Sequence, residues 1–492
     1  MTSTMASTPA PPPATAPAAT GPVLQRNLKN RHIQLIAIGG AIGTGLFMGS
    51  GKTISLAGPS IILVYAIVGF MLFLVMRAMG ELLLHNSNYH SFQDFAEDFL
   101  GGWARFFLGW TYWMSWVVTG MAEIIAVAGY WNFWVNPDDP GKVTATSALL
   151  ALGVLGGLLV LNLLTVKLFG EMEFWFALIK IVAISALVVT GVWLVFTGFS
   201  WQYDGGQAPA QEVTASFAHL WDRGGFFPTG ATGFLAAFQI AIFAFVGVEL
   251  VGTMAAETEN PHKTLPRAIN AIPVRIMVFY VLALVVIVSV TPWDLVNPET
   301  SPFVFLFSLI GLVASASIMN FVVLSSASSS CNAGLFSTSR MLYGLSRNGQ
   351  APAGFARLSS QGVPVRALLL GVGFVACSVF LMFSESIMSA FTIVTTVAST
   401  LLIFVWSMIL ISYLAYRRKL PQAHAASAYP MPGGRAACYL VLTFFAGILV
   451  LLVSTPDTRL PLLMTPLWFA GLGVAWFAHS RRRATELNSL GS

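Results

Sequence analysis

Long apolar stretches separated by short polar ones run through the chain from residue 33 to residue 480. A membrane-spanning helix needs about 20 mostly apolar residues, and windows of that length locate twelve candidate spans. Their approximate limits are 33–56, 60–84, 103–134, 146–166, 172–198, 232–255, 269–291, 304–336, 365–383, 387–416, 436–454 and 462–480. The pattern therefore predicts an all-α polytopic membrane protein with twelve transmembrane helices, whose two ends lie on the same side of the membrane.

The first and the sixth span have sequences that interrupt a helix. The first contains GGAIGTGLF at 39–47, and each glycine costs about 1 kcal/mol in a helix interior relative to alanine. The sixth contains IFAFVGVE at 242–249, with one glycine and a carboxylate at membrane depth. Interrupted spans at matching places of two halves are typical of inverted-repeat transporters with a binding site near the midplane. Close helix packing also explains such glycines, and the sequence leaves both explanations open.

An unwound segment at Gly43–Gly45 would offer backbone N–H groups and the positive end of a helix dipole, which suit a carboxylate. The carbonyl groups freed by a break in span six would suit an ammonium group. Together they fit a zwitterion with the shape of an amino acid, and Phe243 and Phe245 would lie beside its side chain.

Composition supports the membrane interpretation, because only 9% of the residues are charged and 56% are hydrophobic. Soluble domains carry about 25% charged residues, so an ordinary soluble enzyme is excluded. With the N-terminus inside, most Lys and Arg residues fall at cytoplasmic ends, and only Lys142, Arg223 and Arg459 fall in outer loops. The net charge of +5 therefore reflects topology and gives no indication of a nucleic-acid partner.

Three charged residues inside the spans are candidates for proton coupling, namely Lys180, Glu249 and Glu123. Placing a lysine at a helix centre costs about 2.5–3.5 kcal/mol, so Lys180 in span five calls for an explanation. Either its ammonium group exchanges a proton during transport, or the side chain extends to the inner surface of the membrane. Glu123 in span three and Glu249 in span six accept a proton under the same hypothesis, and structural hydrogen bonds are the alternative.

Other polar residues in the spans have simpler explanations. Arg77 and Glu81 close span two at the cytoplasmic face, where they are expected to pair with each other and to contribute to an inner gate. Lys52 is expected to extend outward into solvent. Span eight carries five serines that either serve helix packing or form a polar lining opposite the break in span one; they are Ser325, Ser326, Ser328, Ser329 and Ser330.

No other chemistry is visible in the sequence. A phosphate-binding glycine loop, a pair of histidines with metal-ligand spacing and a nucleophile–base set are all missing, so we expect no enzyme activity, no cofactor and no metal site. The three cysteines do not suggest a disulfide framework. Residues 1–22 form an Ala/Pro/Thr tract that is expected to be disordered and lacks the features of a cleaved signal. Residues 481–492 are expected to form a basic cytoplasmic tail.

Several motifs together resemble the bacterial amino acid permeases of the amino acid–polyamine–organocation superfamily, from about residue 24 to residue 487. They are GGAIGTGLF at 39–47, AGPSIILVYAIVGFMLFLVMRAMGE at 57–81, GEMEFWFALIKI at 170–181, FAFVGVELVGTMAAET at 243–258 and FSTSRMLYGLSRNG at 336–349. The resemblance is strongest to members that carry D-serine, D-alanine and glycine.

The resemblance implies a permease domain over 23–480, in which two inverted repeats of five helices (about 33–198 and 232–416) have broken helices one and six, and two peripheral helices lie at 436–480. It implies proton symport of a small amino acid across the bacterial inner membrane. Its carboxylate would be held by amides of Gly43, Thr44 and Gly45, and its amine by carbonyls of Ala41, Phe243, Ala244 and Val246. Another neutral or aromatic amino acid or γ-aminobutyrate is the alternative substrate, and a sensor that binds without transport is a more distant alternative. The oligomeric state is not predicted.

Overall fold

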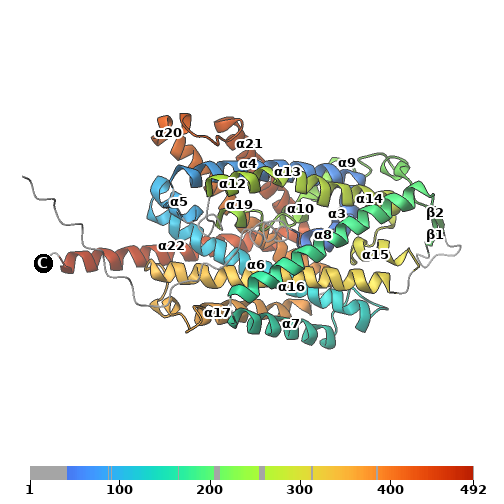
Figure 1. Cartoon of the computed structure of the whole chain (residues 1–492), viewed down its shortest axis with the longest axis horizontal. Helices are drawn as coiled ribbons and strands as arrows, with labels where there is room; N and C mark the ends of the chain where they lie inside the picture. The colour runs from blue at the N-terminus through green and yellow to red at the C-terminus, as the bar shows by residue number, and fades with distance from the viewer. Residues whose placement is uncertain are drawn as a thin grey trace, which may run out of the picture.

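The structure is a computed structural model that describes residues 42–86, 88–89, 91–164, 166–203, 211–253, 261–311, 314–383 and 386–490. Long helices run side by side along the longest dimension of the molecule and form its body (Figure 1). Within the described ranges, nine helical segments are long and apolar enough to cross a membrane. The chain is therefore a mainly helical, polytopic membrane protein.

The helices before residue 260 include several short pieces where longer spans are interrupted. In chain order they are α2 (Thr44–Phe47), α3 (Gly49–Ala57), α4 (Ile61–His85), α5 (Phe92–Leu100), α6 (Gly102–Val135), α7 (Ala145–Leu163), α8 (Val166–Phe196), α9 (Gly230–Ala236), α10 (Phe238–Phe243) and α11 (Leu250–Thr253). The short helix α5 was not predicted, because its nine residues do not form a span; it begins with a capping box between Ser91 and Asp94.

The helices after residue 260 likewise include long spans and short pieces. In chain order they are α12 (Pro261–Asn270), α13 (Ile272–Arg275), a π-helical turn (Ile276–Val281), α14 (Leu282–Val290), α15 (Pro302–Ser308), α16 (Ser315–Arg347), α17 (Val365–Ala376), α18 (Ser378–Met382), α19 (Ile387–Lys419), α20 (Pro421–Ala425), α21 (Gly434–Ser454) and α22 (Pro456–Leu490). The spans predicted at 103–134, 387–416 and 436–454 agree within a few residues with α6, α19 and α21.

The span predicted at 304–336 is wrong at both ends. The short helix α15 is separate, and the long helix α16 begins at Ser315 and continues to Arg347. Hydropathy places the span too early because the apolar run after residue 302 raises the average, while the serines of α16 lower it. Ser325 and Ser328 nevertheless fit inside the helix, since their hydroxyls donate to carbonyl groups of the preceding turn at 2.7 Å and 2.9 Å.

A small antiparallel sheet shows that the chain is not entirely helical. Strands β1 (Ser200–Tyr203) and β2 (Gln211–Thr214) pair so that Trp201 lies opposite Val213. These two side chains are buried, and the Trp201 ring meets Phe305 edge-on at 5.4 Å between centroids. The hairpin therefore packs onto α15, at the same end of the molecule (Figure 1).

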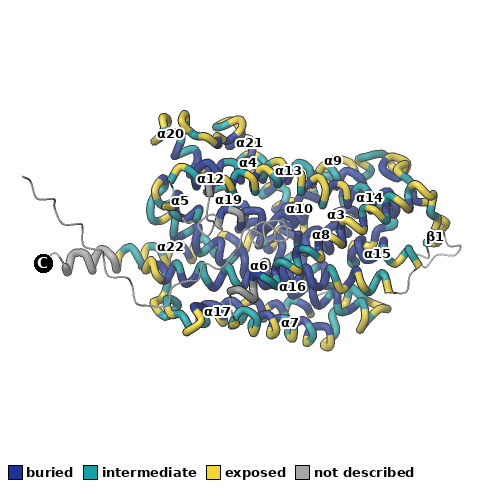
Figure 2. The backbone as a smooth tube through the Cα atoms, in the orientation of Figure 1, coloured by how far each residue is buried: buried dark blue, intermediate teal, exposed yellow. Residues whose placement is uncertain are grey.

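The interior is organised around α6, which packs against α16 and α19. Buried residues dominate this central region, whereas exposed residues gather on the outer helices such as α7 and α17 (Figure 2). The outer helices carry large exposed apolar side chains, including Leu149, Phe380, Val450 and Leu467. Exposed apolar side chains of this kind suit the hydrocarbon region of a bilayer.

Candidate substrate and proton site

The interruption predicted for span six is present. Helix α10 ends at Phe243, the next six residues form turns, and α11 begins at Leu250. Gly247 has a φ of 97°, a backbone conformation that glycine adopts without steric cost. In span one, Gly43 is extended and α2 begins at Thr44. Ala41, one of the predicted binding residues, lies outside the described residues.

The two interrupted spans touch each other at Gly45. A Cβ atom on Gly45 would lie 2.4 Å from the Cα atom of Ala244, so the backbones meet too closely for any other residue. Tyr65 donates a hydrogen bond to the carbonyl of Gly45 at 3.4 Å, and Tyr280 donates to the carbonyl of Ala244 at 3.0 Å. These tyrosines fix the contact between the two segments.

The residues predicted around the substrate amine lie in the break of span six, but part of their hydrogen-bonding capacity is used. The carbonyl of Phe243 accepts the amide of Val246 at 3.1 Å, and the carbonyl of Ala244 accepts Tyr280. A carbonyl oxygen has two lone pairs, so each retains one acceptor position. Phe245 stacks on Tyr280 with 4.9 Å between ring centroids and therefore packs within a buried aromatic cluster.

Glu123 of α6 lies directly against Gly43. Its Oε1 atom would be 3.3 Å from a Cβ at Gly43, and Oγ of Ser330 would be 3.5 Å from the same point. The side chain is 2% exposed. Oε2 of Glu123 and the hydroxyl of Thr44 are buried without a hydrogen-bond partner in the described part of the chain. The Glu123 carboxylate thus lies beside Thr44 and Ser330, so polar groups surround Gly43–Gly45, where the substrate carboxylate is expected.

Lys180 of α8 is fully buried, with an exposure of 1%. Its ammonium group interacts electrostatically with the carboxylates of Glu123 and Glu173. The alternative that Lys180 extends to the membrane surface is therefore wrong, because such a side chain keeps its charged end in water.

Glu173 is the residue of this site that the sequence analysis missed. Its carboxylate accepts hydrogen bonds from Ser329 at 2.8 Å and from Asn332 at 2.7 Å, both on α16. Asn332 in turn accepts a hydrogen bond from Asn162 of α7 at 2.7 Å. A signal was present, because Glu173 precedes Lys180 by two helical turns and so lies on the same face of α8. The hydrogen bond from Ser329 to Glu173 also means that this serine faces a polar cluster and does not serve helix packing alone.

Glu249 lies apart from this cluster. It is buried and accepts hydrogen bonds from Tyr112 and from the backbone amide of Gly247, both at 3.3 Å. The carboxylate therefore supports the turn at the break in span six. Of the three residues predicted for proton coupling, the structure brings Glu123 and Lys180 together and places Glu249 at the break.

Arg77 and Glu81 do not pair with each other, contrary to expectation. Arg77 donates to Asn270 at 2.9 Å and lies over the ring of Tyr429 at 3.7 Å. The carboxylate of Glu81 accepts Tyr413 at 2.8 Å and the amide of Met431 at 2.7 Å, and Nδ1 of His424 lies 2.6 Å from its other oxygen. The i, i+4 spacing was misleading because each side chain has other partners, among them Tyr429, His424 and Met431 in the segment between α19 and α21. They attach this segment to α4.

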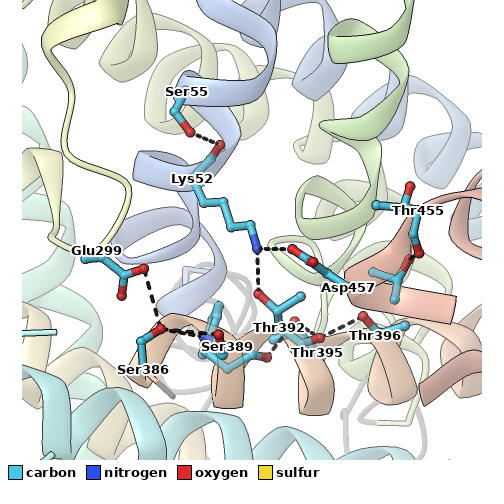
Figure 3. Close-up of polar contacts among 12 residues, drawn as sticks. Lys52, Ser55, Glu299, Ser386, Ser389, Thr392, Thr395, Thr396, Thr455 and Asp457 are labelled. Atoms are coloured by element: carbon cyan, nitrogen blue, oxygen red, sulfur yellow. Dashed lines mark hydrogen bonds and ion pairs between the residues drawn. The ribbon is translucent and has the colours of Figure 1, made fainter. Parts of the chain in front are cut away.

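Lys52 does not extend freely into solvent, which is a second correction. Its ammonium group donates to Asp457 at 3.0 Å and to Thr392 at 3.3 Å (Figure 3). The side chain is therefore held between α3, α19 and α22.

Comparisons with known proteins agree with this architecture. The family model for amino acid permeases matches residues 32–489. The D-serine/D-alanine/glycine transporter of Escherichia coli (strain K12) is 58% identical over 94% of this chain and 96% of the relative. Amino-acid permease AapA of Bacillus subtilis (strain 168) is 49% identical over 93% and 96%, and the aromatic amino acid transport protein AroP of Escherichia coli O6:H1 is 40% identical over 93% and 96%. The chain belongs to the amino acid permease family.

Proposed function

We propose that this protein imports D-alanine, D-serine and glycine together with protons across the bacterial inner membrane. The observation that carries the substrate assignment is the 58% identity, over nearly the whole length of both chains, to a transporter named for these three amino acids. The break in span six and the close contact at Gly45 support a binding site between the two interrupted spans.

In this proposal the amides of Gly43, Thr44 and Gly45 bind the substrate carboxylate, and the buried hydroxyl of Thr44 adds a donor. The carbonyls of Ala41, Phe243, Ala244 and Val246 bind the ammonium group. Small substrates are expected because the backbones meet closely here and the surrounding aromatic side chains are fully buried.

Proton coupling follows from the position of Glu123. A substrate carboxylate at Gly43 would lie beside the carboxylate of Glu123, and two like charges this close in an apolar interior cannot both stay ionised. Substrate therefore binds together with a proton on Glu123. Lys180 and Glu173 then form a neutral ammonium–carboxylate pair, whereas without that proton the three side chains carry a net negative charge.

The wider arrangement completes the proposal. Residues 23–480 form one permease domain of twelve spans with two inverted repeats of five, and both chain ends lie in the cytoplasm, as the distribution of Lys and Arg favours. Arg77 and Glu81, bonded to the segment between α19 and α21, belong to an inner gate. Glu249 takes part by holding the break of span six.

A competition experiment tests the substrate assignment. The purified protein is reconstituted into liposomes with an imposed pH gradient, acidic outside, and uptake of radiolabelled D-alanine is measured. We expect unlabelled D-serine and glycine to compete, while phenylalanine and γ-aminobutyrate leave uptake unchanged. Competition by phenylalanine alone would transfer the assignment to aromatic amino acids.

A further inference from the structure

A cavity of about 330 Å³ lies between the end of α6 and α15, and its wall includes neither Gly45 nor Ala244, where the two broken spans touch. Binding pockets for small molecules commonly measure about 300–1,000 Å³, so the cavity has room for a small organic ligand. Its wall includes Met48, Tyr130, Phe133, Glu299, Ser301 and Asn320. The wall contains no Lys, Arg or His side chain.

Glu299 contributes an unbalanced negative charge to this wall. Its Oε1 atom accepts a hydrogen bond from Ser386 at 3.5 Å, whereas Oε2 is buried without a partner (Figure 3). No ion pair joins Glu299 to a basic residue in the described ranges. Lys52, in the same view, is bound by Asp457 and Thr392 instead.

Tyr130 contributes a second oxygen without a partner. The residue is 5% exposed, and its hydroxyl is buried with no hydrogen bond to any described residue. Its backbone is fixed by Asn320, which donates to the carbonyl of Tyr130 at 2.8 Å. Buried polar atoms normally have partners, so two wall residues that each keep an oxygen without one indicate that a hydrogen-bond donor is missing beside them. The aromatic ring of Phe133 lies in the same wall.

We propose that this cavity binds the primary ammonium group of a small amine that carries no carboxylate, because its wall offers no basic side chain to pair with one. An ammonium ion has three N–H donors and a positive charge, which match the carboxylate of Glu299 and the hydroxyl of Tyr130. An aromatic ring such as that of Phe133 further stabilises a cation.

The cavity adjoins the outer part of span one. Met48 lines it immediately after α2, and Ser301 donates a hydrogen bond to the carbonyl of Phe47 at 2.6 Å. A bound amine therefore lies beside the segment that follows Gly43–Gly45, as a second site near the transport path. The inference does not depend on which amino acid is transported.

Calorimetric titration of the full-length protein in detergent with propylammonium chloride tests the proposal. We expect saturable binding at one site, which persists in the presence of saturating D-alanine. Glu299→Gln keeps the shape but removes the charge, and it should weaken binding at least about tenfold, because charge-assisted hydrogen bonds are the strong ones. Tyr130→Phe should weaken binding less. Glu212→Gln, at an exposed position of strand β2, is the matched control and should bind as the unchanged protein does.

The proposal is overturned if propylammonium does not bind saturably, if Glu299→Gln and Tyr130→Phe both bind it with unchanged affinity, or if D-alanine displaces it fully. The last result would assign the amine to the central site. A protein that binds propylammonium but neither binds nor transports D-alanine would contradict the proposed function and leave this second site supported.

Discussion

Lys180, Glu123 and Glu173 place one positive and two negative side chains in the apolar interior between α6, α8 and α16. Removing one member of a buried charged set typically lowers the free energy of unfolding by about 3–5 kcal/mol, because the remaining charges lose their partner. The function of each residue in the set therefore depends on the other two.

Lys180→Ala should abolish accumulation of D-alanine against its gradient. Without the ammonium group, Glu123 and Glu173 lose the opposite charge that favours their ionised forms, so they hold a proton continuously and the proton gradient no longer drives uptake. Accumulation in proteoliposomes should fall at least about tenfold, since a buried carboxyl group without an opposite charge nearby releases its proton reluctantly. Lys142→Ala, at an exposed position in the loop between α6 and α7, is the control. Normal accumulation by Lys180→Ala, in protein that elutes as a single species, would remove Lys180 from the coupling mechanism.

Gly45→Ala should impair both folding stability and substrate binding. The added methyl group would lie 2.4 Å from the Cα atom of Ala244, and backbone atoms cannot move aside as a flexible side chain can. We expect the free energy of unfolding to fall by about 1–3 kcal/mol, as for other overpacked interiors, and D-alanine binding to be lost. The melting temperature in detergent reports the first effect and direct binding the second.

Gly153→Ala in α7 is the matched control for that experiment. A Cβ atom there meets no atom within 4 Å, and alanine favours a helix, so this variant should be as stable as the parent or more stable. Equal behaviour of the two alanine variants would show that spans one and six do not need to approach each other so closely.

At the level of the elements, the segment between α19 and α21 is attached to α4 by its contacts with Arg77 and Glu81. Glu81 alone accepts hydrogen bonds from Tyr413 and from the amide of Met431, while His424 lies against its other oxygen. Each buried partner left without its hydrogen bond lowers the stability of the folded protein by about 1–3 kcal/mol.

Glu81→Gln should loosen this attachment, because the amide has one acceptor oxygen where the carboxylate has two. Trypsin should then cut after Lys419, at the end of α19, several-fold faster than in the parent protein. Glu212→Gln, on β2 at the other end of the molecule, should leave the cleavage rate unchanged. Equal rates in the two variants would mean that Glu81 does not hold the segment in place.

Element boundaries also show what hydropathy can and cannot predict. It located α6, α19 and α21 well, because their apolar residues are continuous. It misplaced span eight, because serines of α16 such as Ser325 and Ser328 satisfy their hydroxyls within the helix and so remain compatible with the interior despite low hydropathy. The β1–β2 hairpin was missed because strands of four residues carry little periodic signal.

For the molecule as a whole, the motifs predicted the family, and the interrupted spans predicted the place of the break in span six. Contacts between distant segments were beyond sequence reasoning. The partners of Glu81 lie more than 300 residues away, and those of Glu173 lie on α16. The approach of Glu123 to Gly43 depends on the packing of α6 against α2, which no local pattern encodes.

Proton movement driven by substrate is the most direct test of the central claim. Proteoliposomes are loaded with a pH-sensitive dye, with equal pH on both sides and no sodium, and D-alanine is added outside. We expect the interior to acidify as D-alanine enters, because each substrate carboxylate that binds at Gly43 requires a proton on Glu123. Entry of radiolabelled D-alanine without any acidification, or entry only when sodium is supplied, would contradict proton symport.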